Sequence, residues 1–131
     1  MELYGEERNM TVARVVTNEE AMSSRSIFEM QAELCKTMGN AARLRIVHTL
    51  RKGPKRVSDI VEATELAQAK VSQHLAVLRA YGIVSTQREG KDVIYRIANP
   101  KLTRVCDLMR EVLAEQANER SEVFLALQKE L

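Results

Sequence analysis

The stretch that decides the fold is Leu66 to Gly82, LAQAKVSQHLAVLRAYG. On a helix, Val71, Leu75 and Leu78 form one apolar stripe with the i, i+4, i+7 spacing of a helix that packs against a core. The opposite face is small and polar, and no acidic residue occurs from position 66 to 88. Such a face can present amide, hydroxyl and ammonium groups to a polyanion. The stretch therefore predicts a helix that packs on one side and contacts nucleic acid on the other.

The segments around this helix complete a known supersecondary pattern. A shorter apolar helix is expected over residues 58–64, and the link at 66–68 is long enough only for a turn. Two β-rich runs follow at 83–87 and 93–98, separated by a turn at 89–92. Helix, turn, helix and hairpin in this order predict a winged helix-turn-helix: a mostly α chain (α+β class) with a small β-hairpin wing.

Start signals predict further helices before and after this unit. Ser26-x-x-Glu29 is a capping-box pattern and begins the first helix. Asn40 is the expected N-cap of a second helix. Asn99 followed by Pro100 predicts the start of a last, long helix, because proline presets φ for the first helical position.

The length and composition fit one domain with an aliphatic core. The chain has 131 residues, 45% of them hydrophobic and only 4% aromatic. We expect a loose N-terminal arm over 1–25, a DNA-binding and dimerisation domain over 26–117, and a helical extension over 118–131. No apolar run reaches the roughly 18 residues of a membrane span, and residues 1–20 lack the apolar segment of a signal peptide. The expected location is the cytoplasm, with no membrane partner.

The positive charge is concentrated around the predicted helix-turn-helix. Residues 34–88 have ten basic and three acidic side chains. Residues 1–33 have three basic and seven acidic side chains, and residues 89–131 have seven basic and eight acidic ones. Phosphate contacts are expected where the cations gather. Arg79 lies on the central helix, and Arg88, Lys91 and Arg96 surround the tip of the wing.

The apolar stripe of the last helix is too long for a domain of this size to cover alone. Such a stripe usually packs against a second subunit, so we expect a homodimer that forms through the first and last helices. The residues assigned to this interface are Leu34, Leu102, Val105, Met109, Val112 and Leu113.

Three segments resemble the ArsR/SmtB-type winged-helix repressors of bacteria and archaea. They are LCKTMGNAARLRIV at 34–47, VSQHLAVLRAYGIV at 71–84 and REGKDVIYR at 88–96. The resemblance covers about residues 30–115, and the order and spacing of all three segments agree. It implies a homodimer that binds a pseudo-palindromic operator in double-stranded DNA, represses transcription and is released by an effector.

The resemblance also assigns residues by position. The residues that match the family's recognition helix are Gln68, Lys70, Ser72, Gln73 and His74. The chain departs from the family at Ala67, where serine is usual, so the N-cap of this helix is expected to be weak. It also has Ala41 and Ala69 where proline is frequent.

The metal sites known in this family need thiolate or imidazole clusters that the chain lacks. One type places Cys-x-Cys before the recognition helix, but residues 58–62 contain no sulfur; the other uses histidines of the last helix, but 99–116 contain none. We therefore expect no metal and no other cofactor. His74 lies about 60° from the apolar stripe of its helix, which leaves two interpretations: a half-buried contact between helices, or a base contact.

Cys35 and Cys106 also allow two interpretations. Reduced cysteine is commonly a buried packing residue. Alternatively, the two form a dithiol that oxidises to a disulfide or polysulfide bridge and so acts as the effector site, with Lys36 and Arg104 favouring the thiolates. A persulfide-responsive branch of the family uses cysteines on two helices, but at positions that correspond to 47–48 and 113–114 here. That match is therefore one of analogy, and the effector is unknown.

An enzymatic function is not expected from this sequence. It has no Gly-rich phosphate loop, no paired carboxylates in a plausible cleft and no Ser/His/Asp constellation. The alternative to a DNA-binding regulator is a winged helix used as a protein-interaction module. Such a module does not need a basic, acid-free helix face, and its binding would lack the steep salt dependence of phosphate contacts.

Overall fold

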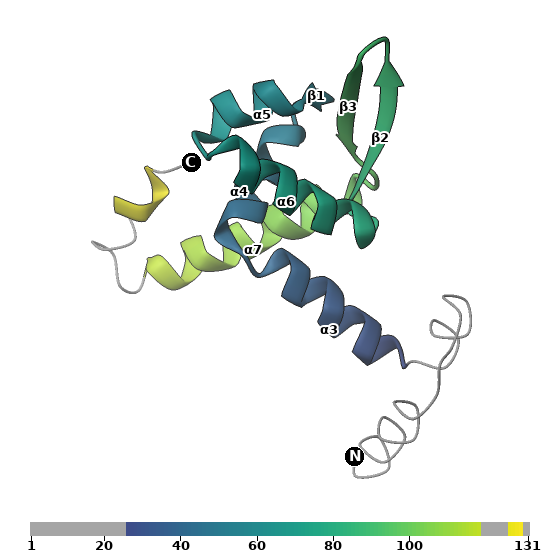
Figure 1. Ribbon diagram of the computed structural model, residues 1–131. Helices are drawn as coiled ribbons and strands as arrows, with labels where there is room; N and C mark the ends of the chain where they lie inside the picture. The colour runs from purple at the N-terminus through teal and green to yellow at the C-terminus, as the bar shows by residue number, and fades with distance from the viewer. Residues whose placement is uncertain (1–25, 119–125, 130–131) are drawn as a thin grey trace. The chain divides into compact units, whose positions relative to one another are not determined.

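The structure of the protein, a computed structural model, describes residues 26–118 and 126–129 (Figure 1). The chain divides into two compact units, residues 1–36 and 37–131. The expected N-terminal arm and most of the expected C-terminal extension lie outside the described residues. The elements are α3 (Ile27–Met38), α4 (Ala41–Leu50), β1 (Lys55–Arg56), α5 (Val57–Thr64), α6 (Gln68–Ala80), β2 (Val84–Glu89), β3 (Asp92–Ile97) and α7 (Lys101–Ala117).

The side chains of all three predicted cap residues accept hydrogen bonds from backbone amides at helix starts. The Ser26 hydroxyl accepts a hydrogen bond from the Glu29 amide at 3.1 Å, which starts α3. The Asn40 carboxamide oxygen accepts from the amide of residue 43 at 3.1 Å and starts α4. Asn99 accepts from the Lys101 amide at 3.0 Å, and α7 begins at Lys101, one residue later than expected. Each cap satisfies a backbone donor that the helix itself leaves unpaired.

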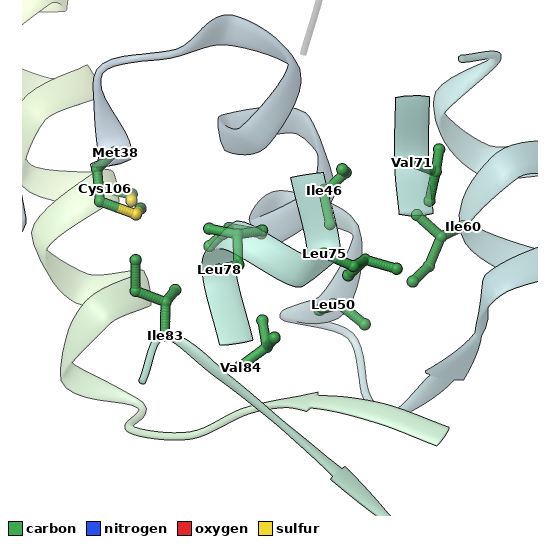
Figure 2. Close-up of a cluster of buried hydrophobic side chains, with 11 residues drawn as sticks. Met38, Ile46, Leu50, Ile60, Val71, Leu75, Leu78, Ile83, Val84 and Cys106 are labelled. Carbon is green, nitrogen blue, oxygen red and sulfur yellow. The ribbon is translucent and has the colours of Figure 1, made fainter. Parts of the chain in front are cut away.

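The core of the second unit is built by α4, α5, α6, the start of the wing and α7. Val71, Leu75 and Leu78, the stripe predicted for the central helix, are each 0% exposed. Figure 2 shows them among the other buried side chains, with Ile46 of α4 and Ile60 of α5 in the same cluster. Burying aliphatic side chains of this size contributes roughly 1.5–3 kcal/mol each. None of the described helices is long and apolar enough to cross a membrane.

The wing is a three-stranded antiparallel sheet with strand order β1-β3-β2. The β2–β3 hairpin was predicted, and Figure 1 shows it extending from the helical body of this unit. Its connection is tighter than the expected turn, because Glu89 already pairs with Asp92. Gly90 adopts φ +61° in the first of the two loop positions, where a two-residue turn of this kind needs glycine. The third strand, β1, was not predicted; it pairs Lys55 with Tyr95.

Candidate nucleic-acid interface

The outward face of α6 carries the small and polar side chains that the sequence predicted. Gln73 lies opposite the buried stripe and is exposed, as are Ala69 and Ala76 on either side of it. α6 contains no acidic residue, so this face has no negative charge to repel a phosphate backbone. The small neighbours let a groove edge approach Gln73 closely.

Seven of the eight predicted DNA contacts are exposed. They are Gln68, Lys70, Ser72, Gln73 and Arg79 on α6, and Arg88 and Lys91 on the wing. None of their side chains forms a hydrogen bond or an ion pair with another residue in the described part of the chain. Their donors are therefore available to an external partner at no cost in internal contacts.

The N-terminus of α6 lacks a side-chain cap. Ala67 has the extended backbone of an N-cap residue, with φ −62° and ψ 143°, but it offers no acceptor. This confirms the weak cap expected from the departure at this position. The first amides of α6 consequently point outward without a side-chain partner, at the positive end of the helix dipole. Lys70 in the same turn adds a full positive charge, and such an end favours an anion.

His74 is half-buried, and its ring contacts another helix. The Arg43 Nε of α4 donates to His74 Nδ1 at 3.4 Å. Burial of the ring, and then the charges of Arg43 and Lys70, lower the pKa of His74 below its ordinary value. Of the two interpretations of His74, the contact between helices is the one that this bond supports.

Two of the wing cations already have partners within the sheet. Arg96 donates to the side chain of Gln87 on the neighbouring strand. Arg56 lies 3.5 Å from a carboxylate oxygen of Asp92 in an exposed ion pair. The cations left for phosphate contacts near the tip are Arg88 and Lys91.

Comparison with known proteins identifies the family. The family model "Bacterial regulatory protein, arsR family" matches residues 40–86, which span α4, α5, α6 and the start of β2. The HTH-type transcriptional regulator Rv0081 of Mycobacterium tuberculosis is 33% identical over 104 residues, which cover 79% of this chain and 91% of that protein. The chain belongs to the ArsR family. It is a transcriptional regulator with a winged helix-turn-helix DNA-binding domain.

Other ArsR-type relatives agree in sequence and in structure. The transcriptional repressor PagR of Bacillus anthracis is 36% identical over 85 residues, 64% of this chain and 85% of its own. The crystal structure of Rv0081 aligns with a TM-score of 0.68 at 31% identity, over 75% of this chain and 99% of that one. A solution structure from Mycobacterium bovis, described as a homodimeric winged helix-turn-helix DNA-binding domain, aligns with a TM-score of 0.66 at 27% identity, over 82% and 95%.

The last helix of this ArsR protein has two apolar faces rather than one stripe. Leu102 and Cys106 pack against the protein's own core. Leu102 is only partly buried there, so its assignment to the subunit interface stays a prediction. The exposed face holds five large apolar side chains that are 45 to 59% exposed. They are Val105, Leu108, Met109, Val112 and Leu113, referred to below as the α7 patch. Leu108 was not predicted from the sequence, although its spacing from Val105 and Val112 is that of the same helix face.

The two cysteines have opposite environments. Cys106 is 5% exposed, and Figure 2 shows its sulfur beside Met38 in the core. Burial raises the pKa of the Cys106 thiol, so the expectation that Arg104 favours a thiolate there was wrong. Cys35 is exposed on α3. In the described part of the chain, no three His, Cys, Asp or Glu side chains are grouped so that they could hold a metal ion.

Proposed function

We propose that the protein is a homodimeric repressor that reads a pseudo-palindromic operator with α6 and holds the DNA backbone with its wing. The observation that carries this proposal is the exposed, acid-free face of α6 around Gln73, whose polar groups have no internal partners among the described residues. In a winged helix-turn-helix dimer, two such helices enter successive major grooves about 34 Å apart. Because its partner is chromosomal DNA, the proposed location is the cytoplasm.

The individual contacts divide into two kinds. Gln73, supported by Gln68 and Ser72, is proposed to read base edges, since a carboxamide can donate and accept at adenine in the major groove. Lys70, the α6 amides and the wing cations are proposed to hold phosphates, which gives affinity without sequence preference.

The test begins with selection of an operator from random duplex DNA by the full-length protein. Gln73→Ala should lose roughly 1–3 kcal/mol on that operator and relax the preference at one base position in each half-site. Gln128→Ala, which removes the same group from an exposed position near the C-terminus, is the matched control. A Gln73→Ala protein that binds as tightly and selectively as wild type would reassign the base contact.

The alternative, a protein-interaction module, is separated from this proposal by salt. Phosphate contacts make log K fall steeply and linearly with log[salt], because bound cations release condensed counterions. A wild-type protein that selects no duplex, or whose DNA binding ignores salt, would favour the interaction module.

For the effector, we propose that an oxidant or a polysulfide acts on the protein by reacting first with the thiol of Cys35. Its exposure lets an oxidant or a polysulfide reach the sulfur, whereas the buried thiol of Cys106 is screened from both. Operator affinity measured before and after polysulfide treatment, in wild type and in Cys35→Ser, tests this input. Loss of affinity in wild type alone would support it.

A further inference from the structure

Arg43 connects three helix segments of the second unit through one guanidinium group. It lies in the first turn of α4, where its own amide is held by the Asn40 cap. Its Nη1 donates to the backbone carbonyl of Thr37, in the last turn of α3, at 3.1 Å. Its Nε donates to Nδ1 of His74 on the recognition helix at 3.4 Å. The planar fork of a guanidinium suits such simultaneous donation in two directions.

The bond from Arg43 to His74 differs from the other contacts of α6, because a hydrogen bond is directional. In the described part of the chain, it is the one side-chain hydrogen bond that α6 makes with another element. The N-cap, Ala67, offers no side-chain bond, and the buried face is entirely aliphatic. Aliphatic packing holds a helix against the core but is not directional. The contact at His74, the residue next to Gln73, therefore adds a directional constraint on the rotation of α6 to the packing of its buried face.

The contact also fixes the protonation state of the ring. A guanidinium can only donate, so this contact requires Nδ1 of His74 as a bare acceptor, in a neutral ring with its proton on Nε2. The charged groups that act on the ring are Arg43 from α4 and Lys70 from its own helix, and both oppose a positive charge there. α5 and β2 also pack against α6, but their charged residues do not contribute.

We propose that Arg43 is a positioning residue for DNA recognition, which orients the base-reading face of α6 by donating to a neutral His74, and that protonation of His74 breaks this contact and weakens operator binding. The inference rests on the proposed function. On protonation, Nδ1 gains a hydrogen that meets the Nε–H of Arg43, so two donors and two positive charges face each other. The ring and the guanidinium must then separate, and α6 loses this constraint at the residue next to Gln73.

The first experiment measures affinity for the selected operator and for random duplex DNA by fluorescence anisotropy at pH 7.5. Arg43→Gln and Arg45→Gln each remove one cation from α4, two positions apart. Arg45 is exposed and has no side-chain partner among the described residues, so it is the matched control. Both variants should lose similar affinity for random DNA. Only Arg43→Gln should lose about tenfold more on the operator, the order expected for one charge-assisted hydrogen bond.

The second experiment is a pH profile of operator binding between pH 5 and 8. A histidine that merely lay near phosphates would strengthen binding as it became protonated. The proposal predicts the opposite: wild-type affinity for the operator falls at acid pH, below the ordinary histidine value, while affinity for random DNA does not. His74→Asn keeps an acceptor near the position of Nδ1 but cannot titrate in this range. It should therefore retain its affinity for the operator at pH 7.5 and lose the acid limb of the profile, which is the fall of operator affinity at acid pH.

A third measurement does not depend on DNA. Nitrogen NMR of the His74 ring should show a bare Nδ1 at neutral pH in the full chain, and its pKa should rise in Arg43→Gln because a neighbouring cation is removed. Equal operator losses in the two arginine variants, or an acid limb that persists in His74→Asn, would overturn the positioning role. A correct NMR result with no operator binding by wild type would instead refute the proposed function. Thermal melting confirms that each variant is folded.

Discussion

Asp107 is held by two arginines and joins α4 to α7. Arg51, the C-cap residue of α4, donates from both terminal nitrogens, at 2.7 and 2.6 Å, to the two carboxylate oxygens. Arg110 adds a bond from one turn further along α7. These bonds, with the one from Arg51 first, lower the pKa of the Asp107 carboxyl. The stabilisation that these bonds give the folded protein is therefore present above the ordinary carboxyl pKa, and it is lost as the pH falls through the lowered pKa of Asp107. The pair is partly exposed, so its main effect is to align the two helices.

The two cysteines should differ in reactivity. In the native protein at pH 7.5, a maleimide should modify Cys35 at least tenfold faster than Cys106, because only opening of the structure exposes a thiol buried in the core. Intact-mass spectrometry over time, on wild type and on each single Cys→Ser variant, gives the two rates separately.

Denaturant provides the control for this measurement. With the chain unfolded, both thiols should react at similar rates, since neither is then shielded. A native Cys106 that reacts as fast as Cys35 would contradict the burial described above. It would also restore the interpretation of the two cysteines as a reactive pair.

At the scale of elements, the wing is predicted to contact phosphates rather than bases. Arg88→Ala combined with Lys91→Ala should weaken binding to operator and to random DNA alike. It should also reduce the slope of log K against log[salt] by about two, because each phosphate contact accounts for roughly one unit. Titrations at four or more salt concentrations measure the slope.

The matched control for the wing removes two cations from α7. Lys101→Ala combined with Arg104→Ala changes the net charge equally, and both residues are exposed. This pair should leave the slope nearly unchanged. A wing variant with the wild-type slope would mean that the hairpin tip does not touch DNA.

The elements that could be predicted from sequence are those with a local signal. α3, α4 and α7 carry their own polar caps, and the stripe of α6 repeats over three turns. The hairpin has its glycine at the turn. β1 could not be predicted, because two residues show no period and pair only with a strand about forty positions away.

The parts of the candidate site that were missed depend on contacts distant in sequence. The Arg43–His74 bond joins residues 31 positions apart, and Arg51 and Asp107 are 56 apart. No local period reports such pairs. The two faces of α7 were merged for a related reason. A stripe shows which residues are apolar, but only the packed structure shows that Leu102 meets the protein's own core and Leu108 does not.

At the scale of the whole molecule, the α7 patch determines the expected assembly. Five large apolar side chains on one exposed face of a helix are more than a monomer usually presents to water. Charged residues such as Arg104 and Glu111 lie on the adjoining exposed face of the same helix. An apolar area bordered by charge is typical of a subunit interface, and the M. bovis relative is described as homodimeric.

We expect the protein to be a dimer at micromolar concentration and Met109→Glu to be a monomer. Met109 lies within the patch and is 45% exposed, so glutamate there is hydrated in a single subunit but becomes an unpaired charge in a closed apolar interface. The variant should therefore melt as a folded monomer, and its affinity for the full operator should fall towards that for one half-site.

Arg104→Glu, which introduces the same charge on the polar side of α7, should remain dimeric. Light scattering after size-exclusion chromatography measures the mass of each. A wild-type protein that is monomeric under these conditions, or a dimeric Met109→Glu, would show that the α7 patch does not form the interface.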